Sequence, residues 1–194
     1  MRQAPSTAVR SAASWASERA RWSLKFGMLI LQTLDAEDWR AWRHLRLQAL
    51  EEAPYAFSAT LADWQGPGDL EQRWRARLRN VAFNVIAFLD NKPAGMVSAT
   101  QPDAENQVGL LSMWVAPWAR GCGVGNALVA SVVKWAEETK SNRVIIRVYE
   151  DNGQAIALYA RNGFVDTPLV ELSPDGQRRE QVMAHDLRSS TIAG

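Results

Sequence analysis

The stretch that decides the fold of this 194-residue chain is residues 115–128, which read VAPWARGCGVGNAL. The end of an apolar strand is followed here by a proline turn, a glycine-rich loop that Arg120 opens, and the start of an amphipathic helix. Gly121, Gly123 and Gly125 permit positive φ and let the backbone approach a ligand without a Cβ in the way. Because several N–H groups then converge on an anion at a helix N-terminus, the stretch predicts a phosphate cradle.

A second informative segment begins twenty-seven residues after Gly125 and reads NGQAIALYARNGF. Its first residue, Asn152, is of a type that often caps a helix N-terminus. Ala155, Ile156 and Tyr159 follow at helical spacing, and Gly163 with Phe164 is typical of a helix end. The segment therefore predicts a short capped helix.

Together, the two segments resemble the GCN5-related N-acetyltransferase (GNAT) family. The family's first signature, (Arg/Gln)-x-x-Gly-x-(Gly/Ala), matches residues 120–125, and its second, Asn-x-x-Ala-x-x-x-Tyr followed by Gly-Phe, matches residues 152–164. The resemblance covers roughly residues 28–187 and is most specific over residues 111–164. It implies acetyl-CoA as the donor and direct transfer of the acetyl group to the primary amine of a small molecule or peptide.

Two rival phosphate loops fit the sequence less well. A nucleoside-triphosphate loop needs Lys and then Ser or Thr after its last glycine, but Asn126 and Ala127 follow Gly125. A dinucleotide loop needs Gly or Ala at the position of Asn126 and an acidic residue that ends a second strand. The acidic residues at about the right distance, Glu137 and Glu138, fall in a helical stretch.

Composition narrows the set of partners. The 22 basic and 21 acidic residues leave a net charge of +1, which favours neither nucleic acid nor a membrane surface as partner. The single cysteine, Cys122, and the widely separated His44 and His185 give no metal-ligand spacing, so no metal is expected. No apolar run approaches the roughly twenty residues that span a bilayer. We expect a cytoplasmic monomer or homodimer.

The chain divides into three parts. Residues 28–188 are expected to form the acetyltransferase domain, and residues 189–194 a short tail. Residues 1–27 are rich in Ala, Ser and Arg and offer little apolar surface. We expect them to be a poorly ordered extension, created by a start codon assigned upstream of Met28, although their composition also suits a transit peptide.

The fold class expected from these patterns is a mixed α/β arrangement. Hairpins on both sides of an alternating strand-helix-strand-helix centre indicate a mixed sheet. The strands are expected at residues 28–34, 81–89, 94–101, 108–115, 144–148, 164–172 and 180–186, and the helices at 35–53, 69–80, 123–139 and 152–161. The resemblance implies a mostly antiparallel sheet of about seven strands, flanked by about four helices, in which strands 108–115 and 144–148 are parallel and splayed to admit the pantetheine arm.

The resemblance also implies the donor site. The backbone of the loop would hold the pyrophosphate, through Arg120, Gly121, Cys122, Gly123, Val124, Gly125 and Asn126. The main chain of Met113, Trp114 and Val115 would pair with pantetheine, with the Val115 N–H as oxyanion donor. Asn152 would donate or accept a hydrogen bond to pantetheine, besides capping its helix, and Tyr159 would be the general acid for the CoA thiolate. Outside the family, these residues suit a buried strand, a helix cap and a core tyrosine equally well.

The acceptor side is less determined by the sequence. Relatives that acetylate ribosomal protein N-termini often carry glutamate five residues before the motif asparagine, where this chain has Arg147, which weighs against a peptide N-terminus. Glu105 is the expected base, with Glu150 or a water chain as alternatives. Tyr55 and Phe57 are the expected walls of the acceptor site. Cys122 is interpreted as filling the loop rather than as a nucleophile.

Other interpretations remain open at this point. Arg73, Arg75, Arg77 and Arg79 of the second helix are expected to form a solvated face, the alternative being a role in binding an acidic acceptor. A non-catalytic acyl-CoA-binding module would keep the same cradle, and an O-acyltransferase or an enzyme for longer acyl chains would share both signatures.

Overall fold

The computed structural model describes residues 19–24, 27–174 and 176–187. These residues form a mixed sheet with strands in the order β1-β2-β3-β4-β5-β6-β8-β7. The strands are β1 (Arg19–Leu24), β2 (Gly27–Thr33), β3 (Phe83–Leu89), β4 (Lys92–Ala99), β5 (Gln107–Val115), β6 (Arg143–Tyr149), β7 (Val165–Leu172) and β8 (Arg179–Asp186). The α-helices are α1 (Trp39–Glu52), α2 (Glu71–Asn80), α3 (Val124–Glu138) and α4 (Gly153–Arg161).

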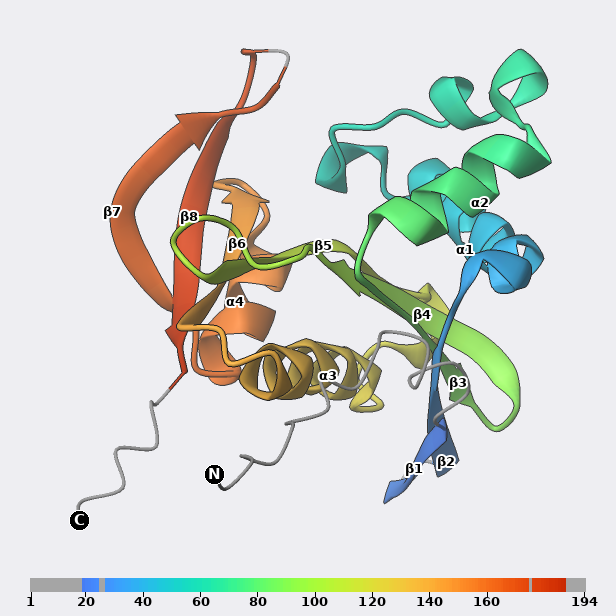
Figure 1. Cartoon of the computed structure of the whole chain (residues 1–194), viewed down its shortest axis with the longest axis horizontal. Helices are drawn as coiled ribbons and strands as arrows, with labels where there is room; N and C mark the ends of the chain where they lie inside the picture. The colour runs from blue at the N-terminus through green and yellow to red at the C-terminus, as the bar shows by residue number, and fades with distance from the viewer. Residues whose placement is uncertain (1–18, 25–26, 175, 188–194) are drawn as a thin grey trace, which may run out of the picture.

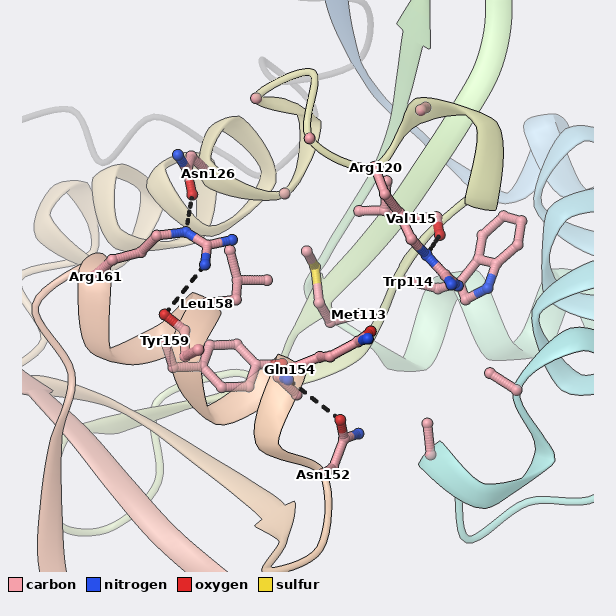
Figure 2. A pocket seen from close by; sticks show the side chains of 18 of the residues that line it. Met113, Trp114, Val115, Arg120, Asn126, Asn152, Gln154, Leu158, Tyr159 and Arg161 are labelled. Atoms are coloured by element: carbon pink, nitrogen blue, oxygen red, sulfur yellow. Dashed lines mark hydrogen bonds between the residues drawn. The ribbon is translucent and has the colours of Figure 1, made fainter.

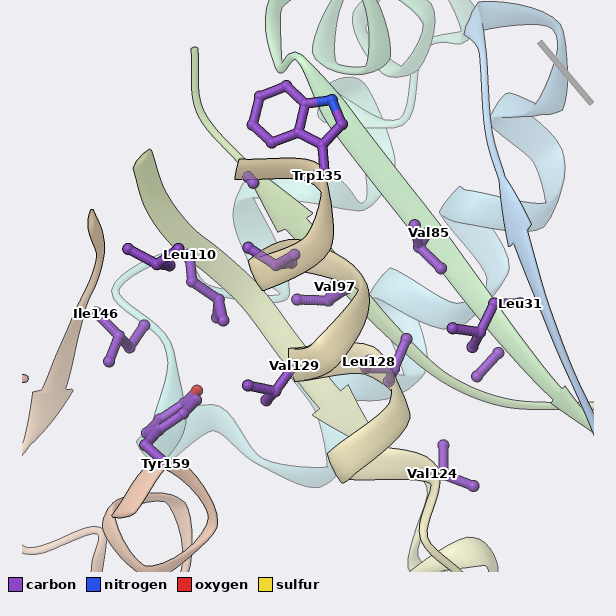
Figure 3. Packing of buried hydrophobic residues seen from close by; sticks show 14 of the residues in the cluster. Leu31, Val85, Val97, Leu110, Val124, Leu128, Val129, Trp135, Ile146 and Tyr159 are labelled. Atoms are coloured by element: carbon purple, nitrogen blue, oxygen red, sulfur yellow. The ribbon is translucent and has the colours of Figure 1, made fainter. Parts of the chain in front are cut away.

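Helices cover both faces of the sheet (Figure 1). Successive side chains of a strand point to opposite faces, and the strands are apolar on both. Leu31, Val85 and Val97 pack with the apolar side of α3, as Figure 3 shows. Ile86 and Met96 face the other way and pack with the tryptophans of α1 and α2. The sheet is thus buried between two helical layers.

The expected fold class is confirmed, and the predicted helices and strands are all present. One difference concerns residues 19–24, which were expected to belong to an unstructured extension. They form β1, which pairs antiparallel with β2 from Arg19↔Gln32 to Leu24↔Gly27. An edge strand such as β2 presents free N–H and C=O groups that a further strand can pair with. The remaining predictions for 1–18 and for the tail at 189–194 lie outside the described residues.

The centre of the sheet opens between β5 and β6. These two strands are parallel, as predicted, and pair at Gln107↔Arg143, Val108↔Val144 and Gly109↔Ile145. Beyond Gly109, β5 continues to Val115 without a partner in β6. A bulge bends β5 at this point, where Ser112 adopts φ +54° and the register against β4 shifts. The two strands therefore diverge and leave a gap.

None of the helices in the described part of the chain is long and apolar enough to cross a membrane.

Candidate active site

The glycine loop turns tightly into α3. Gly121 has φ +77°, and Gly123, which caps the N-terminus of α3, has φ +83°. A Cβ on Gly121 would meet nothing within 4 Å, so this side of the loop is open to a ligand. Gly125 does not adopt the positive φ that the sequence suggested, and its missing side chain serves helix packing. It lies inside α3, and a Cβ there would come within 3.2 Å of the Leu158 side chain, so this glycine lets α4 pack closely.

The first turn of α3 keeps its N–H groups available. The N–H groups of Gly123, Val124, Gly125 and Asn126 have no hydrogen-bond acceptor among the described residues. The first N–H groups of any helix lack intrahelical partners and carry the positive end of the helix dipole. Free N–H groups at a helix N-terminus beside an open loop are the features that bind anions in proteins, so anion binding by this loop stays a prediction.

Arg120 does not point into this cradle. Its Nε donates to the Val115 carbonyl at 3.1 Å, and its Nη2 forms an ion pair with Glu52 of α1 at 2.7 Å. The same Glu52 oxygen accepts from Trp114 Nε1 at 2.9 Å. Arg120 thus ties the loop to the end of β5 and to α1, as Figure 2 shows for its contact with Val115.

A cavity of about 740 Å³ lies in front of the glycine loop and runs along the open part of β5 to α4 (Figure 2). Most of the predicted donor-site residues line it: Met113, Trp114, Val115, Arg120, Gly121, Gly123, Gly125, Asn126, Asn152 and Tyr159. Cys122 and Val124 do not. Cys122 is half-buried, with its Sγ 3.8 Å from the Arg120 carbonyl, and the Val124 side chain packs in the core.

Sequence reasoning missed a cation in this cavity. Arg161, in the last turn of α4, lines the cavity, and its Nε donates to Asn126 Oδ1 at 3.1 Å. Asn126 Oδ1 also accepts from Asn162 Nδ2 at 3.0 Å. The sequence signal that could have indicated this cation is Arg161 itself, a basic residue within the second family segment. Its contact partner lies on another helix, which spacing along the chain did not indicate.

The backbone of Val115 faces the gap between the strands. Ala116 N–H donates to the Ala94 carbonyl of the neighbouring strand at 2.9 Å. Since backbone groups in an antiparallel pair alternate in direction from one residue to the next, the Val115 N–H points away from β4. The N–H is directed toward the gap between β5 and β6, as an oxyanion donor requires.

Tyr159 connects the cavity to a second one. Its side chain is buried, lines both cavities and packs against Phe164, with ring centroids 5.7 Å apart. Burial raises the pKa of the phenol well above its usual value near 10, because the charged phenolate is disfavoured away from water. The hydroxyl therefore keeps its proton at physiological pH and is a donor. Asn152, which caps α4 by accepting from the Ala155 N–H at 3.2 Å, also lines both cavities.

The second cavity, of about 490 Å³, occupies the space between β5, β6 and the segment that follows α1. Phe57 lines it, whereas Tyr55 lines the first cavity, so the structure separates the two predicted wall residues. Pro174 and Glu180 of the final hairpin close the other side. Arg178 links the hairpin to the same segment by donating to the Tyr55 carbonyl at 2.5 Å.

The carboxylates expected to act as base lie elsewhere. Glu105 is in the turn before β5, where it accepts a hydrogen bond from Gln107, and Glu150 pairs with Arg179 at 2.9 Å. Neither lines either cavity, so the geometry gives the prediction of Glu105 as base no support. Of the acidic residues in the described chain, Glu180 alone lines either of these two cavities, and sequence reasoning missed it. It lies beside the open gap only because β8 pairs with β6.

Among the described residues, no group of three or more His, Cys, Asp or Glu side chains is arranged to hold a metal ion.

Comparison with known proteins identifies the family and the fold. The model of the acetyltransferase (GNAT) family matches residues 36–164. No curated protein matches the chain in sequence. Mycobacterium smegmatis RimJ, solved in complex with CoA-disulfide, is similar in structure, with a TM-score of 0.71 at 17% identity over 89% of this chain and 88% of its own.

Two further solved structures share the fold. A ribosomal-protein-alanine N-acetyltransferase from Brucella melitensis has a TM-score of 0.61 and 23% identity, over 81% of this chain and 99% of its own. The putative acetyltransferase yncA from Salmonella typhimurium, solved with acetyl-CoA, has a TM-score of 0.61 and 17% identity, over 86% of this chain and 98% of its own.

Proposed function

The chain belongs to the acetyltransferase (GNAT) family, and on that premise we propose that it transfers the acetyl group of acetyl-CoA directly to the primary amine of an acceptor bound in the second cavity. One observation carries the proposal. The cavity in front of the glycine loop and the cavity beside Phe57 meet at shared lining residues, namely Ala56, Met113, Asn152, Ala155 and Tyr159. A donor and an acceptor bound on the two sides would meet where β5 and β6 diverge.

The donor cavity fits the parts of acetyl-CoA. The free N–H groups at the start of α3 and the charge of Arg161 suit the pyrophosphate. The unpaired edge of β5 up to Val115 suits the amide groups of pantetheine, which bind as an added strand would. Bound there, acetyl-CoA supplies the acetyl group as a reactive thioester.

The protein's own groups then manage charge and protons. The Val115 N–H is directed to the gap, where it would stabilise negative charge that develops on the acyl oxygen. The Tyr159 hydroxyl, kept protonated by its raised pKa, would donate to the departing thiolate. Glu180 places a carboxylate in the second cavity, which favours a positively charged amine as acceptor.

The test is release of CoA from acetyl-CoA over a panel of polyamines, aminoglycosides, amino acids and N-terminal peptides. We expect turnover with at least one class of primary amine and none with the matching alcohols. A chain that binds acetyl-CoA but turns over none of these amines would instead be an acyl-CoA-binding regulatory module. Preference for alcohols, or for a longer acyl donor, would contradict the assigned acceptor or donor.

A further inference from the structure

Two arginines of the helical layer on one face of the sheet point into the second cavity. Arg46 of α1 and Arg77 of α2 both line it. Arg46 is only 9% exposed, and Arg77 is partly buried. Arg77 was expected to belong to a solvated face with its neighbours in α2, and this expectation is wrong for Arg77 itself.

The guanidinium of Arg46 has a buried nitrogen without a hydrogen-bond partner in the described part of the chain. Its Nη1 is buried and finds no partner among the described residues. The guanidinium lies over the Phe57 ring, 4.4 Å from the centroid, which fixes its plane but satisfies none of its N–H groups. An unpaired buried polar group costs free energy, and a charged one costs more. The side chain is therefore positioned for a partner that the chain does not supply.

Arg77 is held in place by neutral groups. Its Nη1 donates to Asn84 Oδ1 at 3.1 Å, and its Nη2 donates to Ser98 Oγ and Ser112 Oγ, each at 3.2 Å. Asn84 is itself fixed by donating to the Leu78 and Val81 carbonyls. These contacts orient the guanidinium at the bulge of β5. They leave its positive charge without an acidic partner among the described residues.

The charges in the cavity do not balance. Burial, with a smaller contribution from the nearby Arg77, lowers the pKa of Arg46 to about 10, and burial lowers that of Arg77 to about 10 as well. Both remain cationic at neutral pH. The third arginine of the cavity, Arg147, is paired with Glu171 at 2.5 Å, and Glu180 is the one acid among the described lining residues. Neither Arg46 nor Arg77 forms an ion pair with a carboxylate among the described residues, and the three arginines outnumber the two acids, Glu171 and Glu180.

We propose that Arg46 and Arg77 bind a carboxylate of the acceptor, so that the acceptor is an amino acid or a close analogue with a free carboxylate. Arg46 can donate its unpaired guanidinium N–H groups to a carboxylate, and the positive charge of Arg77, whose terminal nitrogens already donate to Asn84, Ser98 and Ser112, adds to the attraction. The volume of this cavity, about 490 Å³, lies within the range of small-molecule sites. Phe57 and Trp64, which also line it, suit an apolar or aromatic side chain of the acceptor. This inference rests on the proposed transfer to an amine and narrows its acceptor.

The first experiment compares matched acceptors with the wild-type protein. CoA release is measured for apolar and aromatic amino acids, for their amides, for the corresponding amines without a carboxylate, and for aminophosphonic analogues. Binding of each is also measured by calorimetry in the presence of CoA. We expect free amino acids to bind and react at least tenfold better than their amides and amines. Equal or better performance of the aminophosphonic acids would overturn the assignment of a carboxylate, because the site would then accept any anion.

A second experiment tests the arginines. Arg46→Gln should raise the KM for the amino acid at least tenfold, reduce the preference for acid over amide, and leave the KM for acetyl-CoA unchanged. Arg79→Gln, an exposed change on α2 outside both cavities, is the matched control. Thermal unfolding of both variants checks the fold.

The outcomes separate this inference from the proposed function. If amines bind or react equally well with and without a carboxylate, the inference about the carboxylate is overturned and the proposed function stands. A preference for peptides with an amidated C-terminus has the same consequence. An Arg46→Gln variant that keeps the wild-type preference does the same. Failure to bind acetyl-CoA overturns the proposed function.

Discussion

At the scale of single residues, Tyr159 joins the two cavities and carries the proton chemistry of the proposal. It is buried by its position on α4 between Phe164 and the sheet, and that burial keeps the phenol protonated. The same burial would suit a tyrosine that only packs. The two roles differ in what the hydroxyl contributes, because the ring packs equally well without it.

Replacing Tyr159 by Phe separates these roles. We expect a fall in kcat of about 10² to 10⁴, the usual contribution of a positioned acid, equivalent to roughly 3 to 5 kcal/mol of barrier. Affinity for acetyl-CoA should not change, because the ring is kept. Steady-state kinetics at neutral pH and calorimetry measure the two quantities. A fall below tenfold would return Tyr159 to a packing role.

The pH profile adds a check on the wild-type enzyme. The pKa of Tyr159 is raised, so the hydroxyl is present below its usual value near 10 and is lost only above that pH. We therefore expect the wild-type kcat to show no decline between pH 7 and 10 that is caused by Tyr159. A decline in the wild type that is absent from the Tyr159→Phe variant is the pattern that should not occur. Such a decline would mean that the phenol titrates in the ordinary range and is not desolvated.

The glycine loop is tested by Gly123→Glu. The change places a side chain and a negative charge in the cradle, at a backbone position with φ +83°. Affinity for acetyl-CoA should fall at least a hundredfold, equivalent to about 3 kcal/mol. Gly66→Glu is the control, because Gly66 also has positive φ (+56°) with nothing within 4 Å of an added Cβ, yet lines neither cavity. Equal affinities in calorimetry would remove the loop from the donor site.

At the scale of secondary-structure elements, a hydrogen-bonded cluster fixes α1 against α2. Asp69, just before α2, accepts from Arg43 Nε of α1 at 2.6 Å and from Trp74 Nε1 of α2 at 2.8 Å. The bonds from Arg43 and Trp74 lower the pKa of Asp69 to about 2. Because α1 carries Arg46 and α2 carries Arg77, this cluster also sets the spacing of the two arginines.

Asp69→Asn should destabilise the protein by about 1.5 to 3 kcal/mol at pH 7, the usual range for hydrogen bonds to a charged group. Since the folded pKa of Asp69 is depressed, its contribution is complete above the unfolded value near 4 and is lost as pH falls toward 2. The difference from wild type in urea unfolding should therefore shrink below pH 4. Asp166→Asn, an exposed change on β7, is the control. A difference that does not vary with pH would argue against the ion pair.

At the scale of the whole molecule, the sheet has two parts joined by few contacts. β5 and β6 pair at three positions, and the donor cavity lies across the gap between β5 and α4. A ligand in that cavity would contact both parts. It would bind the folded protein and not the unfolded chain, so it should stabilise the fold.

Acetyl-CoA at about 100 times its Kd should add about 2.7 kcal/mol of stability. For a domain of this size the melting temperature should rise by roughly 5 to 10 °C. Thermal unfolding measures the shift, and the Gly123→Glu variant should show little or none of it at the same ligand concentration. A wild-type melting temperature that does not respond to acetyl-CoA would contradict the donor site.

The sequence by itself determined the fold class and the order of elements, and it located the glycine loop to which we assign the donor. The runs of apolar residues placed the strands, and the turn between β3 and β4 at Asp90 and Asn91, with φ of +50° and +63°, uses residue types that favour such turns. The two motifs, at residues 120–125 and 152–164, identified the family because each reads as a continuous segment of chain. Such features depend on near neighbours in the sequence, which is why they could be predicted.

Tertiary structure alone decided which distant side chains share a cavity. Glu105 seemed suitable because it precedes β5, but pairing of β8 with β6 brought Glu180 to the gap instead. Arg77 resembled its exposed neighbours in α2, and only the packing of α2 on the sheet turned it inward to Ser98 and Ser112. The physical reason is that burial and charge pairing depend on contacts between elements far apart in the chain, which local patterns do not encode.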